Sequence, residues 1–130
     1  MRIVAAALLL LMAAAAAAAP GTGWSRASDL SVYGSMHVFA RTALDQEMLC
    51  AGVAPGRASA RWERRFGWRQ QAVTAALTQR YGAAALARAR ATWAPPVACG
   101  DVPDPQWRSR YEQLLRLLEI RFRLTGERRR

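Results

Sequence analysis

The sequence predicts an all-α protein: a small disulfide-stapled bundle of three long helices and one short one after a cleavable signal peptide. Apolar residues recur at three- and four-residue spacing in three long segments, no useful stretch alternates as a β-strand does, and two cysteines follow an export-type leader. The length suffices for one domain and not two. We therefore assign a signal peptide to 1–19, a flexible N-terminus to 20–27, a single helical domain to 28–126 and a basic tail to 127–130.

The leader has the layout of a secretory signal peptide. Arg2 precedes an apolar run from Ile3 to Met12, and unbroken alanine then continues to Ala19, which supplies the small residues that a signal peptidase requires. The alternative is a retained transmembrane anchor, but an apolar stretch of about 17 residues is at the lower limit for a span, and much of it is alanine. We expect cleavage shortly before Pro20, no transmembrane segment afterwards, and a periplasmic or secreted location.

The first two long helices follow from apolar periodicity and from glycine positions. One helix is expected within Ser28–Cys50, where apolar residues recur on one face. Gly34 weakens its first half, so the secure part is His37–Cys50, and Gly52 ends it. A second helix is expected at Ala58–Tyr81, with a glycine directly after it as the C-terminal cap.

A short alanine-rich helix is expected at Ala83–Trp93, closed by two prolines. The last long helix has the clearest start, because Asp104 is a good N-cap and Pro105 fits the first helical position. Its apolar stripe consists of Trp107, Tyr111, Leu114, Leu115, Leu118 and Phe122. Two favourable ion pairs one turn apart are also expected on this helix, Glu112 with Arg116 and Glu119 with Arg123.

The two cysteines, Cys50 and Cys99, predict one structural disulfide in an exported chain. The bond would close a loop of about 50 residues and stabilise the fold by roughly 4 kcal/mol through chain entropy. A redox pair would have its cysteines two residues apart, and a nucleophilic thiol would need a histidine base, for which His37 is the only residue in the chain. We therefore expect the cysteines to hold the fold together and not to react.

The charge balance indicates the class of partner. All nineteen basic residues are arginine, against nine acids, which gives a formal net charge of +10. Such a charge attracts anionic membrane surfaces, lipopolysaccharide, nucleic acid or acidic proteins. The leader argues against intracellular nucleic acid, so the expected partner is an anionic envelope component or an acidic protein. The sequence does not indicate an oligomeric state.

Arginines alternate with aromatic residues on the second helix and give the one positive indication of function. Arginine beside tryptophan binds phosphates, lipid head groups and single-stranded nucleic acid. The alternative is a solvated flank, in which Trp62 and Phe66 are buried and the arginine stems cover the edge of the core. Trp68 lies off that buried stripe. The candidate anion-binding residues are Arg57, Arg61, Arg65, Arg69 and Trp68.

Catalytic and cofactor motifs are missing from the sequence. It contains no phosphate loop, nucleophile elbow or dinucleotide fingerprint, so we assign no catalytic residue, no cofactor and no metal ligand. His37 has no carboxylate beside it on its own helix, and we expect a partly exposed residue. The favoured function is a non-catalytic interaction module that uses the basic arginine and tryptophan face. The alternatives are a scaffold, or a small envelope enzyme in which Glu63 or Glu112 comes within hydrogen-bond reach of His37.

Overall fold

The structure is a computed structural model that describes residues 25–94, 96–97, 99 and 106–124. Within these residues every regular element is helical and no strand is present, which confirms the all-α prediction. The elements are α2 (Arg26–Leu49), α3 (Pro55–Trp62), η1 (Glu63–Gly67), α4 (Trp68–Tyr81), α5 (Ala83–Arg90) and α6 (Gln106–Arg121). α3, η1 and α4 follow one another without a break, so this run, α2 and α6 correspond approximately to the three long helices. The predicted signal peptide, the basic tail and the cap at Asp104 lie outside the described residues.

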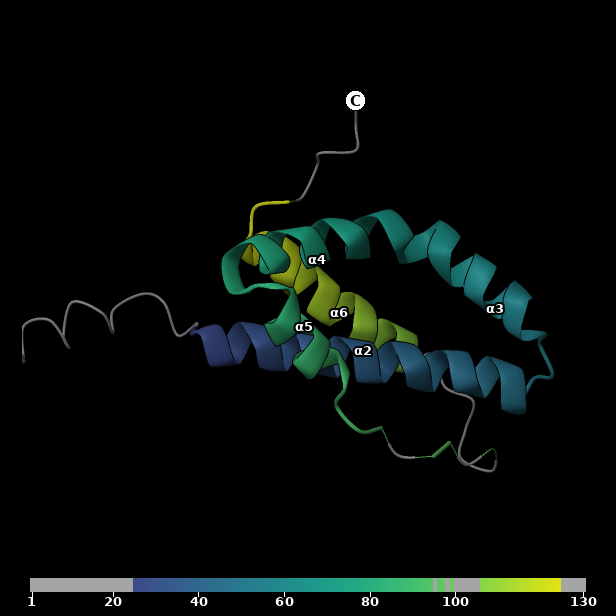
Figure 1. Cartoon of the computed structure of the whole chain (residues 1–130). Helices are drawn as coiled ribbons and strands as arrows, with labels where there is room; N and C mark the ends of the chain where they lie inside the picture. Colours follow the sequence, from purple (N-terminus) through teal and green to yellow (C-terminus); the bar gives the residue numbers. More distant parts are fainter. Residues whose placement is uncertain (1–24, 95, 98, 100–105, 125–130) are drawn as a thin grey trace, which may run out of the picture.

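Helix α6 lies between the two other long helical segments (Figure 1). α2 packs along one side of it, and the run from α3 through η1 to α4 passes over the other side. The short helix α5 packs against α2 and α4. At the far end of the molecule α3 returns to contact α2. The N-terminal part of α2 is therefore close to α4 and α5, and its C-terminal part faces α3.

The core lies where these helices meet, and its residues belong to the apolar stripes of the sequence. Each side chain buried there gains about 1.5–3 kcal/mol relative to exposure. The hydroxyl groups of two core tyrosines find partners on α4: Tyr33 lies 3.0 Å from Thr74 Oγ1, and Tyr111 donates to Gln70 Oε1 at 2.6 Å. The largest core side chains, all at most 1 % exposed, are Tyr33, Met36, Phe66, Val73, Leu77, Leu86, Tyr111, Leu115 and Leu118.

Helix α2 starts earlier than the sequence indicates. It begins at Arg26, with Ser25 as N-cap, whose hydroxyl accepts a hydrogen bond from the Ser28 N–H at 3.2 Å. Gly34 does not weaken the helix, because it is buried where α5 approaches most closely. A Cβ at this position would lie 2.8 Å from the backbone oxygen of Ala89. Packing against α5 therefore outweighs the low helix propensity of glycine.

The second helical run also differs from the expectation. It begins at Pro55 rather than Ala58, with proline in the first turn, where its missing N–H costs nothing. A π-helical turn, η1, interrupts the α-helix from Glu63 to Gly67, and apolar periodicity gave no sign of it. The run ends as expected at Gly82, whose φ of 90° is readily adopted only by glycine.

The disulfide between Cys50 and Cys99 is present, with a Cα–Cα distance of 5.2 Å. This confirms the predicted bond. Cys50 is the C-cap of α2, so the bond joins the C-terminal end of that helix to the segment between α5 and α6. The covalent link therefore holds the end of the molecule where α2 faces α3.

A buried carboxylate joins three helices at the opposite end. Asp29, in the first turn of α2, is fully buried. Its carboxylate accepts hydrogen bonds from Tyr81 Oη at 2.5 Å and from Arg121 Nε at 3.4 Å. The buried charge is thus paired and hydrogen-bonded, the condition under which a buried ion is tolerated.

Candidate anion-binding site

The candidate residues on the second helical run divide between two surroundings. Arg57 and Arg61 lie on α3, Arg65 lies in η1, and Trp68 and Arg69 begin α4. Arg61 and Arg65 line a cavity between helices, whereas Arg69 faces α6. Arg57 is exposed and Trp68 is half-buried, and neither is among the described residues that line the cavity. Of the five residues predicted to form one surface, only Arg61 and Arg65 therefore line the same cavity.

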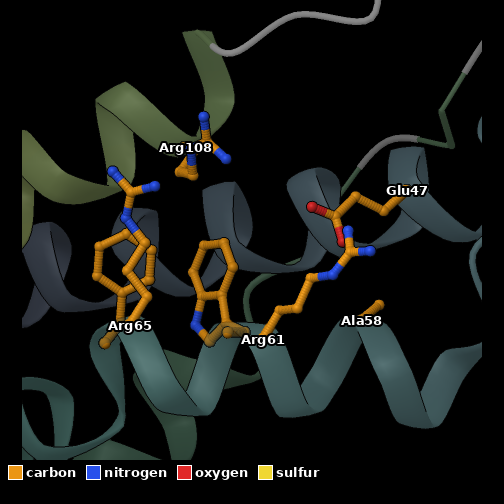
Figure 2. A pocket seen from close by; sticks show the side chains of 7 residues that line it. Glu47, Ala58, Arg61, Arg65 and Arg108 are labelled. Atoms are coloured by element: carbon orange, nitrogen blue, oxygen red, sulfur yellow. The ribbon is translucent and has the colours of Figure 1, made fainter.

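The cavity lies between the C-terminal part of α2, the α3–η1 run and the start of α6, and its volume is about 160 Å³. Figure 2 shows Arg61 and Arg65 extending from the α3–η1 run, Glu47 extending from α2 on the opposite side, and Arg108 entering from α6. The Arg61 and Glu47 side chains extend toward one another across it. The described lining residues are Glu47, Ala58, Arg61, Trp62, Arg65, Phe66 and Arg108.

Aromatic rings make one wall of the cavity rigid. The Trp62 ring centroid lies 4.8 Å from that of Phe66 and 4.6 Å from that of Tyr111, in tilted or edge-on contacts. Burial raises the pKa of Tyr111, so its hydroxyl stays protonated and keeps donating to Gln70. The half-buried Trp62 therefore packs on two buried aromatic neighbours at this wall of the cavity.

The arginines at the cavity are weakly engaged. Arg61 and Arg108 are exposed, and neither forms an ion pair or hydrogen bond with any described residue. Arg65 lies 3.7 Å from a Glu112 carboxylate oxygen, with about half of its side chain exposed, and its guanidinium lies 5.2 Å from the Phe66 ring centroid. An exposed ion pair of this length contributes at most about 1 kcal/mol. Among the described residues, Arg61 and Arg108 thus have no carboxylate partner, and Arg65 has only a weak one.

Arg69 differs from these residues because it already pairs with a carboxylate of the protein, that of Glu119 on α6. Its Nε and Nη2 donate to the two carboxylate oxygens of Glu119 at 3.0 and 2.5 Å, and Nη1 lies 3.5 Å from Glu112. The hydrogen bonds to Glu119 raise the pKa of Arg69. The predicted pairs of these two glutamates along α6 are accordingly wrong: among the described residues both pair with arginines of the neighbouring run. Packing brings together charges that are far apart in the sequence.

Two members of the cavity, Glu47 and Arg108, were not among the sequence candidates. Glu47 contributes a carboxylate whose Oε2 is buried and has no hydrogen-bond partner among the described residues. The signal that could have found both was the disulfide itself. It joins the end of α2, directly after Glu47, to the segment that leads into α6 and Arg108.

The histidine lies away from this cavity. His37 is half-buried on α2, with its ring 4.6 Å from the Tyr33 ring and its Nε2 buried without a partner among the described residues. Burial, followed by the positive charges of Arg90 and Arg41, lowers its pKa to about 4. Neither of the glutamates that the enzyme alternative requires forms a hydrogen bond to it in the described part of the chain. The geometry does not favour that alternative.

Further kinds of site were sought in the described residues. No group of three or more histidine, cysteine, aspartate or glutamate side chains in the described ranges is arranged to hold a metal ion. No described helix is long and apolar enough to cross a membrane. A second hollow, of about 280 Å³, is lined in the described chain only by residues of α6. Comparisons of the chain with protein-family models, curated proteins and solved structures find no match.

Proposed function

We propose that this protein is a non-catalytic interaction module that binds an anionic group in the cavity between α2, the α3–η1 run and α6. The observation that supports the proposal is the convergence of Arg61, Arg65 and Arg108 on one cavity. Two of these arginines have no carboxylate partner among the described residues. Guanidinium groups present paired donors in a plane, which matches a carboxylate or a phosphate.

The size of the cavity limits what it binds. Pockets that enclose a drug-sized ligand measure roughly 300–1,000 Å³. The volume here is about 160 Å³, so the cavity accommodates one charged group and not a whole cofactor. The remainder of the ligand would lie outside, across the exposed Arg57 and Arg64. This arrangement suits a repeating polymer, a membrane surface or an acidic protein segment.

We also propose that the protein acts in the periplasm or outside the cell, after removal of residues 1–19. The Cys50–Cys99 bond supports this, because disulfides persist in oxidising compartments and are rare in the cytosol. The expected partner there is an anionic envelope component or an acidic protein. Mass spectrometry of the protein recovered from the envelope fraction should give a chain that begins close to Pro20. Recovery of an intact leader from the membrane fraction would show a retained anchor instead.

The binding proposal is tested by comparing two triple variants that lose the same charge. The site variant carries Arg61→Gln, Arg65→Gln and Arg108→Gln. The control carries Arg88→Gln, Arg116→Gln and Arg123→Gln, three exposed arginines without ion pairs among the described residues. Each protein is loaded on phosphocellulose at low ionic strength and eluted with a salt gradient.

The site variant should elute at clearly lower salt than the control variant. Its three substitutions remove guanidinium donors that converge on one cavity, whereas those of the control remove charge alone. Both should melt close to the wild type, because exposed substitutions change stability by only about 0.5 kcal/mol each. Equal elution of the two variants would mean that net charge alone is responsible for binding, and the proposed site would be wrong.

A further inference from the structure

The Glu47 carboxylate in the cavity indicates what kind of anion the site selects. Glu47 extends from α2 into the cavity that the three arginines line. Its Oε2 is buried and accepts no hydrogen bond from any described residue. Leaving a charged acceptor buried and unpaired is unfavourable. The inference drawn from this residue rests on the proposed function and specifies the ligand of the same site.

A simple anion does not satisfy Glu47. Phosphate monoesters and carboxylates carry acceptor oxygens that suit the arginines, but they repel a second carboxylate. A donor that arrives together with the negative charge would supply the partner that Glu47 Oε2 lacks among the described residues. A hydroxyl close to the anionic group meets this requirement, because one ligand then contacts both the guanidinium groups and Glu47 Oε2.

The aromatic wall adds a second requirement. Trp62 lines the cavity and packs against the rings of Phe66 and Tyr111. A ring that has C–H groups on its face and hydroxyls at its edge packs on an aromatic surface while its edge reaches polar groups. A sugar ring has this construction. An extended acidic peptide side chain has a carboxylate and no hydroxyl beside it.

We propose that the site binds one acidic sugar unit, with its charged group inside the cavity and its ring partly outside it. Its phosphate or carboxylate lies among Arg61, Arg65 and Arg108, a neighbouring hydroxyl donates to Glu47 Oε2, and the ring packs on Trp62. A sugar phosphate and a uronic acid share this chemistry. An acidic polysaccharide or a phosphorylated glycolipid head group would present it at a cell envelope.

The test compares ligands that differ only in the hydroxyl-bearing ring. Glucose 1-phosphate and galacturonate are the acidic sugars, methyl phosphate and acetate are the matched anions without a sugar, and methyl glucoside is the neutral sugar. Binding to the full chain is followed by NMR titration of the tryptophan indole signals at low ionic strength. The wild type should bind an acidic sugar at least about tenfold more tightly than its matched anion, as a hydrogen bond to a charged group allows.

Substitution of Glu47 should change the affinity for acidic sugars and the affinity for simple anions differently. In Glu47→Gln the acidic sugars should bind about tenfold more weakly, because the hydrogen bond to a full charge is lost, whereas methyl phosphate should bind as well or better, because a repulsive charge is removed. The matched control is Glu63→Gln, an exposed neighbour in η1 that does not line the cavity. It should change all the affinities equally and slightly.

Each other outcome rejects one of the two proposals. If Glu47→Gln strengthens the binding of acidic sugars and methyl phosphate alike, Glu47 is only a repulsive charge; the sugar inference is then wrong and the anion site stands. If the sugar and its matched anion bind equally, the inference is wrong as well. If the wild type binds neither kind of anion, the proposed function is wrong. Glucose 1-phosphate and galacturonate together show whether the bound group is a phosphate or a carboxylate.

Discussion

Helix α2 carries a carboxylate near each end, and the two have opposite surroundings. Asp29 is fully buried, and Tyr81 and Arg121 both donate to it. Glu47 lies at the other end beside a cavity with three arginines, yet its Oε2 has no hydrogen-bond partner in the described chain. Within the described residues, α2 thus holds one carboxylate with hydrogen-bond donors on both oxygens and one with an unpartnered, buried oxygen.

This difference suggests that one end of α2 contributes to stability and the other to binding. Buried polar groups in native proteins are nearly always hydrogen-bonded, and exceptions concentrate at sites that act on something else. The Asp29 end meets the rule with partners from α4 and α6. The Glu47 end departs from it, because Glu47 Oε2 is buried and has no hydrogen-bond partner among the described residues. We therefore interpret the first end as structural and the second as the site.

The largest expected effect on stability is the loss of the Asp29 carboxylate, compared with the loss of the Glu47 carboxylate. Asp29→Ala leaves the half-buried Arg121 and the Tyr81 hydroxyl without their acceptor, and should lower the free energy of unfolding by about 3–5 kcal/mol. Glu47→Ala should change it by less than about 1 kcal/mol, because no hydrogen bond is lost. Urea denaturation of both variants measures the contrast. Equal destabilisation by the two substitutions would remove the distinction between the two ends.

The disulfide should contribute almost as much, because it holds the end of α2 that lacks a buried ion pair. The Cys50→Ser, Cys99→Ser variant opens a loop of about 50 residues and should lose up to about 4 kcal/mol. Hydrogen exchange should rise more around Glu47 than around Asp29, since only the first end loses its restraint. An unchanged melting temperature under reducing conditions would show that the bond does not stabilise this end.

A smaller effect is expected in the N-terminal half of α2, where α5 packs on it. Gly34→Ala would place its Cβ 2.8 Å from the Ala89 backbone oxygen, and overpacking of this kind costs about 1–3 kcal/mol. The better helix propensity of alanine offsets less than about 1 kcal/mol of that cost. Gly56→Ala is the matched control, because its Cβ would meet nothing within 4 Å. It should be neutral or stabilising in thermal melts, and a stabilising Gly34→Ala would contradict the close packing.

Much of the fold could be predicted from local patterns. The helical stripes and the cysteine pair follow from spacing and from compartment, and the structure confirms both. The early start of α2 could not be predicted, because Gly34 is unfavourable in an isolated helix and only its contact with Ala89 explains its presence. The π turn of η1 is likewise invisible to a 3.6-residue period.

The site was predicted only in part, for a similar reason. Arg61, Arg65 and Arg69 are equivalent by spacing, yet the first two line the cavity and the third pairs with Glu119. That partner lies on another helix, so no local rule separates Arg69 from its neighbours. Arg108 entered the site through the same kind of long-range packing.

The smallest effect concerns pH and lies between the two ends of α2. His37 has a pKa of about 4 in the folded protein, lowered from its ordinary value of 6.5 by burial and by Arg90 and Arg41. Between these values the unfolded chain binds a proton that the folded chain does not. The contribution of His37 to the free energy of unfolding should therefore be fully present above pH 6.5, and it should be lost as the pH decreases toward 4.

His37→Gln isolates this contribution, because glutamine is polar and carries no titrating charge. The melting temperature of the wild type should decrease by more than that of the variant between pH 6.5 and 4, and carboxylates that titrate in the same range act equally on both proteins. The two pH profiles should run parallel above pH 6.5. Parallel profiles over the whole range would mean that His37 is protonated as easily in the folded chain as in the unfolded one. Burial and the charges of Arg90 and Arg41 would then have no net effect on the pKa of His37.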